Sequence, residues 1–187
     1  MVLVRLASAY TTSLVVNPVP TKAMTAAVVA AVGDAMAQHA DPAVDTYQVV
    51  RGLTFSNFGA IYTGAGQHHI FGWLQTHCTG SWLLPAAVEC TLVNQCVIIP
   101  LLYYPLFFLL SGLSRGMGLQ STFMDARRNY VPFILSNWRF WLPVQAVLFA
   151  CVSAEFLVLA TCLAGVVWNF ILSSLTYRKR ASSIALA

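Results

Sequence analysis

Charged side chains are scarce in this chain of 187 residues: 9% of its residues are charged, whereas 58% are hydrophobic. Soluble domains carry about 25% charged residues, and ten basic and six acidic side chains could not cover the surface of a soluble fold this large. The mean hydropathy is +0.71. This composition predicts an integral membrane protein, with residues 1–187 forming a single helical membrane domain.

Sequence patterns of several functional classes are also missing. The chain has no Asn-x-Ser/Thr acceptor and no Cys-x-x-Cys pair, and its five cysteines are odd in number, which argues against a secreted disulfide framework. No glycine-rich phosphate loop, Ser-His-Asp order or carboxylate pair is visible, and the histidines lack zinc-site spacing. We therefore expect neither an enzyme nor a metal or other cofactor. A net charge of +4 without a broad basic face argues against nucleic-acid binding.

The apolar stretches predict an all-α bundle of four transmembrane helices, at about 22–39, 52–74, 90–112 and 154–176, since a span needs about 20 residues. Residues 121–150 mix charged with aromatic side chains and are predicted to form an interfacial segment before the last span. Residues 140–177 could form one long helix or two segments. Lysines and arginines divide equally between the two predicted faces, so membrane orientation stays open.

Small residues recur every four positions in the second predicted span. In membranes, such a stripe allows helices to approach closely, because packing drives their association there. We expect this face to pack against a neighbouring helix; the alternative is that it frames a narrow polar passage. The stripe consists of Gly52, Ser56, Ala60, Gly64 and Gly72.

Asp34 is the most unusual residue of the first predicted span, because a carboxylate inside a membrane costs about 2.5–3.5 kcal/mol even on lenient scales. Gln38, one turn further on, could share a hydrogen bond with it. Other partners must come from other helices, and His68, Gln95 and Gln145 are the candidates. The predicted polar cluster of these five residues either clamps helices together or supports the passage of ions or protons.

Short motifs along residues 10–177 follow the order found in a known family. The sequence resembles the Mpv17 / PMP22 family, small four-helix proteins of mitochondrial inner and peroxisomal membranes. Near the end of the chain, the matching signature residues are Trp138, Trp141, Trp168 and Asn169. Earlier matches are Pro20-Thr21-Lys22, Gly33-Asp34, Gln38, Asp45, Arg51, Gly59, Gly64, His68, Gln95 with Pro100, Asn137, Gln145 and Phe149.

The resemblance implies a channel-like or homeostatic role in an organellar membrane, but several motif positions have lost a polar or charged group. Leu157, for example, stands where the family has arginine. We therefore expect a non-catalytic accessory subunit, docked with other membrane subunits in the lipid bilayer of the mitochondrial inner membrane. The alternatives are a small ion- or solute-conducting channel and location in the peroxisomal membrane. Aromatic and aliphatic side chains near Leu101–Leu110 are expected to offer an apolar face to lipid or a partner.

Overall fold

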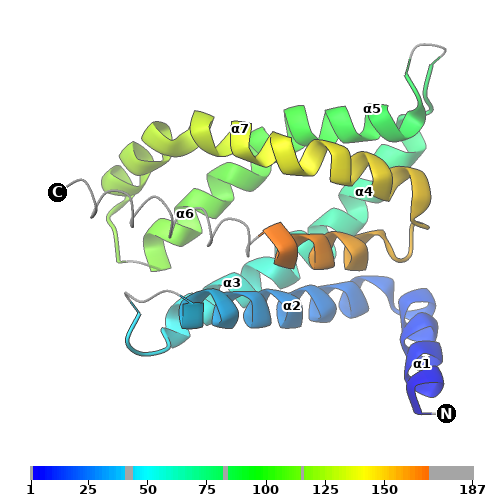
Figure 1. Cartoon of the computed structure of the whole chain (residues 1–187), viewed down its shortest axis with the longest axis horizontal. Coiled ribbons are helices and arrows are strands. Elements are labelled where there is room, and N and C mark those ends of the chain that lie inside the picture. The colour runs from blue at the N-terminus through cyan, green and yellow to red at the C-terminus, as the bar shows by residue number, and fades with distance from the viewer. Residues whose placement is uncertain (1, 41–43, 82–83, 115, 169–187) are drawn as a thin grey trace.

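The computed structural model describes residues 2–40, 44–81, 84–114 and 116–168, and within these ranges the regular structure is helical. The helices run mostly along one long axis, and α1 lies across one end of the bundle (Figure 1). In chain order, they are α1 Val2–Val16, α2 Pro18–Ala40, α3 Val49–Phe58, η1 Gly59–Gly66, α4 Gln67–His77, α5 Ala86–Val93, η2 Asn94–Tyr103, α6 Tyr104–Ser114, α7 Leu119–Cys151 and a last helix Leu157–Trp168.

Two of the long helical rods contain a π-helical segment, in which backbone bonds join residues five positions apart. The first rod joins α3, η1 and α4, and the second joins α5, η2 and α6 without a break. η2 contains Pro100, a residue whose missing N–H interrupts ordinary helical bonding. The kink expected from this proline therefore takes the form of a wider helical turn.

The helix Ala86–Ser114 is long and apolar enough to cross a membrane, and Leu157–Trp168 is a shorter apolar helix. Four transmembrane helices are thus not confirmed. Lys22, Asp34 and Gln38 lower the hydropathy of the alanine-rich α2, and Gln67 and His68 do the same in the first rod. The last predicted span, 154–176, extends beyond the described residues.

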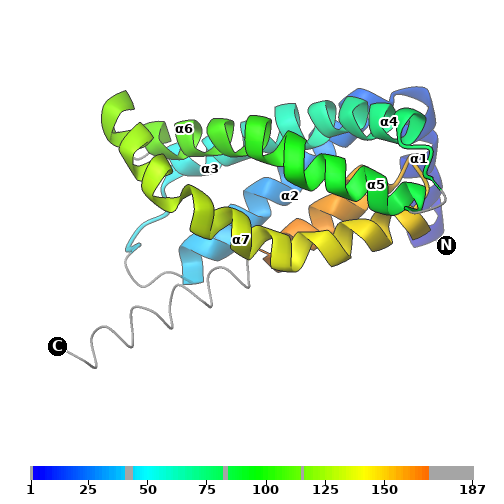
Figure 2. The ribbon, with the colours of Figure 1, turned by 90° about the horizontal axis from the view of Figure 1, so that it is seen from above.

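The predicted interfacial segment, 121–150, lies within α7, which is one continuous helix of 33 residues. At 1.5 Å per residue, α7 is about 50 Å long. It packs against α5 and α6, and Figure 2 shows it running beside them. Its buried residues Thr122, Asn137 and Gln145 are spread along its length. α7 therefore packs against the rest of the bundle at several points. The chain turns after Cys151, so the described part of 140–177 forms two helical segments.

Two apolar clusters form the core. One joins α2, α4, α5 and the last helix, and includes Leu74, Leu157 and Val158, each at most 1% exposed. The other joins η2 and α6 to α7 through Tyr104 and Phe108. These aromatic side chains were expected to contribute to an outer face, but they are 1% and 7% exposed. Aliphatic neighbours such as Leu101, 73% exposed, occupy the outside instead.

Candidate functional site: polar contacts between the helices

Asp34 forms an ion pair with Arg51, whose Nε lies 3.0 Å from the carboxylate Oδ1. The other carboxylate oxygen, Oδ2, accepts a hydrogen bond of 2.6 Å from Gln38 Nε2. Gln38 also holds the start of α3, because its Oε1 accepts a 2.7 Å bond from the Gln48 backbone N–H. The side chain of Asp34 is 5% exposed and that of Arg51 30%. The group therefore neutralises a buried carboxylate and joins α2 to α3.

The structure corrects the partners predicted for Asp34, because it pairs this residue with Arg51 and not with His68, Gln95 or Gln145. The local bond to Gln38 is present as expected. Sequence reasoning missed Arg51 because it placed this residue in the connection between the first two predicted spans, outside the helices. The signal was the short connection after α2: a helical hairpin brings the end of α2 beside the start of α3, where Arg51 lies.

His68 takes part in a second contact, at the other end of α2. The buried Lys22 donates from its Nζ to His68 Nδ1 at 3.1 Å and to the Ala154 carbonyl at 3.3 Å. With Lys22 as an ammonium, which can only donate, Nδ1 is the acceptor and the imidazole proton belongs on Nε2. The contact joins α2, α4 and the segment before the last helix. Lys22 was not among the predicted site residues.

Gln95 and Gln145 belong to a third group, in the contact between η2 and α7. Gln95 Nε2 donates to Gln145 Oε1 at 2.7 Å, and Gln95 Oε1 accepts from Asn137 Nδ2 at 2.8 Å. All three side chains are at most 5% exposed. The five residues predicted as one polar cluster thus lie in three groups, each of which fastens a different pair of helices.

Proline creates further polar contacts between η2 and α7. In a π-helix, the N–H of residue 100 would donate to the carbonyl of Gln95, but proline has no N–H. Trp138 Nε1 donates to this carbonyl at 2.9 Å. Pro105 similarly cannot donate to the carbonyl of Pro100, which accepts a 2.6 Å bond from the Tyr130 hydroxyl. Side chains of α7 thus replace both donors in an apolar environment where unpaired backbone groups are costly.

The small-residue stripe lies largely against α2. A Cβ atom on Gly64 would lie 2.7 Å from the Ala23 nitrogen and the Lys22 carbonyl oxygen, and the Ser56 hydroxyl donates to the Ala27 carbonyl at 3.2 Å. On Gly52, a Cβ would collide with the Tyr47 hydroxyl and lie 3.5 Å from Asp34 Oδ2. These positions allow close approach of the first rod to α2.

Two members of the predicted stripe behave differently. Gly72 is exposed, and nothing lies within 4 Å of the position that a Cβ atom on it would occupy, while Ala60 is half-buried. The contact expected at Ala60 is made by Gly59, where a Cβ would lie 2.7 Å from the Ala30 Cβ. The π-helical turn explains the shift, because residues facing α2 are then no longer spaced by four.

The remaining signature residues lie near the last helix. Trp168 stacks on Phe140 of α7 with ring centroids 5.2 Å apart, and Trp141 meets the same ring edge-on. Asn169 lies outside the described residues. Within the ranges that the structure describes, no group of three or more His, Cys, Asp or Glu residues could hold a metal ion.

The sequence pattern of the Mpv17 / PMP22 family matches residues 112–173 of this chain. The resemblance to the Mpv17 / PMP22 family is confirmed. Peroxisomal membrane protein 2 of Bos taurus is 26% identical over 181 residues, which cover 91% of this chain and 89% of the relative. No solved structure matches the chain. The similarity to this family of membrane proteins supports association with a lipid bilayer.

Proposed function

We propose that this chain is a non-catalytic structural subunit of a larger assembly in an organellar membrane. The observation that carries the proposal is the use of the polar side chains between the helices. Asp34 and Arg51, Lys22 and His68, and Gln95 and Gln145 each join one helix to another. A conducting path needs polar groups that replace the hydration shell of a passing solute along its length, whereas these groups are engaged with each other.

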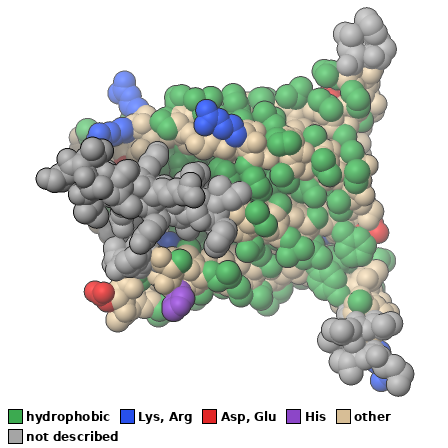
Figure 3. All heavy atoms as spheres, viewed as in Figure 1, with side chains coloured by type: hydrophobic (Ala, Val, Ile, Leu, Met, Phe, Trp, Pro, Cys, Tyr) green, Lys and Arg blue, Asp and Glu red, His purple; other side chains and the backbone are tan. Residues whose placement is uncertain are grey.

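The outer surface supports the same proposal. On α2, an apolar stripe at four-residue spacing is 52–67% exposed, and it consists of Met24, Val28, Val32 and Met36. Figure 3 shows hydrophobic side chains over much of the face that includes α2, α7 and the last helix. An outer surface of this kind suits lipid chains or the apolar helices of neighbouring subunits.

For the organelle, the name of the bovine relative supports the peroxisomal membrane over the mitochondrial inner membrane that we expected from sequence. The relative covers nearly the whole chain, whereas mitochondrial location rests on the family resemblance alone. The test is microscopy of the tagged full chain with markers for both organelles. Overlap with the mitochondrial marker alone would overturn the peroxisomal assignment.

The assembly is tested by extracting the native protein in a mild detergent and separating it by native electrophoresis. We expect the chain to migrate with a complex much larger than its own 20.4 kDa and to shift to lower mass in a harsh detergent. A triple variant of the α2 stripe, Val28→Ser, Val32→Ser and Met36→Ser, should weaken this co-migration. Migration as a single chain under the mildest conditions would overturn the proposal.

A channel is the second candidate, and it is supported by buried polar atoms that lack a hydrogen-bond partner. These include Gln67 Oε1, Asn94 Nδ2 and Gln145 Nε2. Such atoms could bind water or a passing solute inside the bundle. The test is reconstitution into planar bilayers: reproducible single-channel currents that vanish in Asp34→Asn would favour the channel over the structural subunit.

A further inference from the structure

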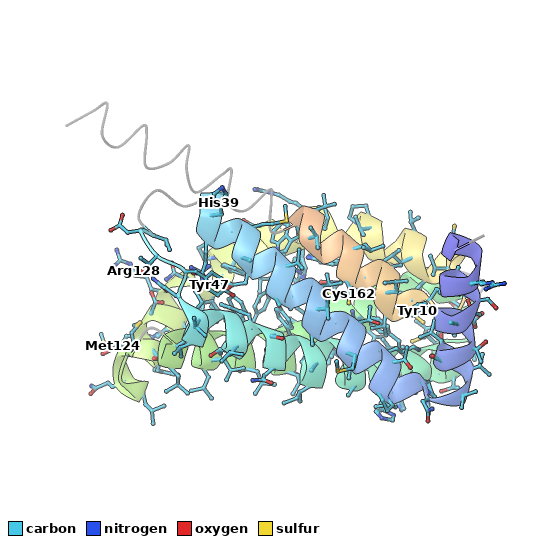
Figure 4. The ribbon with its side chains drawn as sticks, turned by 90° about the horizontal axis from the view of Figure 1, so that it is seen from below. Tyr10, His39, Tyr47, Met124, Arg128 and Cys162 are labelled. Carbon is cyan, nitrogen blue, oxygen red and sulfur yellow. The ribbon has the colours of Figure 1, made fainter. Side chains whose placement is uncertain are left out.

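A cavity of about 180 Å³ opens at the end of the bundle where α1 turns into α2. Tyr10 on α1 holds this corner together through its hydroxyl, which lies 3.1 Å from Thr25 Oγ1 of α2; Figure 4 shows Tyr10 at this end. The wall contains both apolar and polar side chains, including Leu14, Phe71, Val158, Lys22, His68 and Glu155.

Lys22 is the unusual group in this wall, because its ammonium is buried but meets neutral acceptors. The residue is 5% exposed, and its Nζ donates to His68 Nδ1 and the Ala154 carbonyl. Among the described residues, no carboxylate lies within ion-pair distance of it. An ammonium has three donors, so one remains for a ligand, and a buried cation favours an anionic one.

Glu155 restricts which anion can bind. Its exposed carboxylate lines the same cavity as Lys22, so an anion with no positive group would be attracted by one residue and repelled by the other. A ligand with a phosphate and an amine on neighbouring atoms satisfies both. The phosphate would accept from Lys22 Nζ and from His68 Nε2, while the ammonium would lie against Glu155.

We propose that the cavity binds the headgroup of phosphatidylethanolamine. Ligand pockets for drug-sized molecules measure roughly 300–1,000 Å³, so this smaller cavity fits a headgroup while acyl chains stay outside. The bundle end is where a helix running along the membrane normal would meet the headgroup layer. The apolar side chains of Leu14, Phe71 and Val158 can then contact the first carbons of those chains.

The test is native mass spectrometry of the full chain in mild detergent, offered equal amounts of phosphatidylethanolamine and phosphatidylglycerol with identical acyl chains. The structure leads us to expect about tenfold preference for phosphatidylethanolamine, the effect of one charge-assisted hydrogen bond. Glu155→Gln should abolish this preference without affecting folding, because the side chain is exposed. Lys22→Met should reduce retention of both lipids.

Arg128→Met is the matched control, since it removes an exposed positive charge at the other end of the bundle from Tyr10 (Figure 4). It should leave both lipids bound as in the wild type. Equal retention of both lipids by the wild type, or an unchanged preference in Glu155→Gln, would overturn the proposal. If Lys22→Met does not fold, Glu155→Gln alone decides.

A further arm separates the lipid from a soluble source of the same chemistry. Glycerophosphoethanolamine has the headgroup without acyl chains and should displace the lipid only in large excess. Displacement at equal concentration would overturn the lipid as ligand. None of these measurements requires the partner complex, so the lipid site can fail while the proposed subunit role stands, and the reverse.

Discussion

Gly64→Ala tests the close approach of η1 to α2 with the smallest possible change. The added methyl group would meet the Ala23 nitrogen and the Lys22 carbonyl oxygen at 2.7 Å, and the Ala23 Cα closer still. All three are backbone atoms, so no flexible side chain can move aside and the helices must separate. Overpacking of this kind costs about 1–3 kcal/mol. In a domain of this size, 1 kcal/mol shifts Tm by roughly 2–4 °C, so Tm should fall by about 2–12 °C.

The measurement is thermal unfolding of the purified chain in detergent, with Gly72→Ala as the matched control. Gly72 lies on the same helical rod, but nothing lies within 4 Å of the position of its missing Cβ. Replacing a helical glycine by alanine without a clash stabilises a helix by about 0.5–1 kcal/mol. Gly72→Ala should therefore keep or raise Tm, and Gly64→Leu should lower it further than Gly64→Ala. Equal Tm values for Gly64→Ala and Gly72→Ala would refute the close approach.

Asp34→Leu should lower stability in detergent by about 1–3 kcal/mol, because it leaves the partly buried guanidinium of Arg51 without its carboxylate. Adding Arg51→Leu should restore part of the loss. An unchanged Tm in the single variant would contradict the ion pair. Trp138→Phe should lower the free energy of unfolding by about 1–3 kcal/mol, because the Gln95 carbonyl loses its donor. Trp141→Phe removes an indole that has no hydrogen bond among the described residues, so it should cost clearly less. Similar losses in the two variants would argue against donor replacement. Tyr130→Phe should also be destabilising, because the Pro100 carbonyl loses its donor. Hydrogen–deuterium exchange should then increase in residues 100–105. A packing defect elsewhere in the bundle would not produce this local increase.

The sequence supports the helical architecture and much of the small-residue contact, because both depend on local spacing. Gly52, Ser56 and Gly64 can be predicted from their four-residue period, and the structure places each of them against or beside α2. The period fails at Ala60, where Gly59 makes the contact. That failure has a physical cause, because a π-helical turn changes which residues share a face. The residue types of 59–66 do not predict π-helical hydrogen bonding.

Partners of the buried polar groups were less predictable, because they depend on how helices are placed side by side. That Asp34 needs a partner follows from its apolar surroundings alone. Which residue supplies it depends on the hairpin between α2 and α3, which brings Arg51 to 3.0 Å. Burial of the aromatic part of α6 was missed for the same reason: Tyr104 and Phe133 come together with ring centroids 5.5 Å apart only once α7 lies alongside.

The contact between η2 and α7 depends both on local residue spacing and on how the two helices are placed side by side. Pro100 and Pro105 are five residues apart, which is the spacing of donor and acceptor in a π-helix, and each deprives a carbonyl of its donor. Tyr130 and Trp138 are eight residues apart, close to two turns of an α-helix, so their side chains leave the same face of α7. Because each of the two donors reaches one of the two carbonyls, a sliding of α7 by one turn would leave both carbonyls without these donors. The prolines thus help to fix the register of α7 on η2 as well as the path of their own helix.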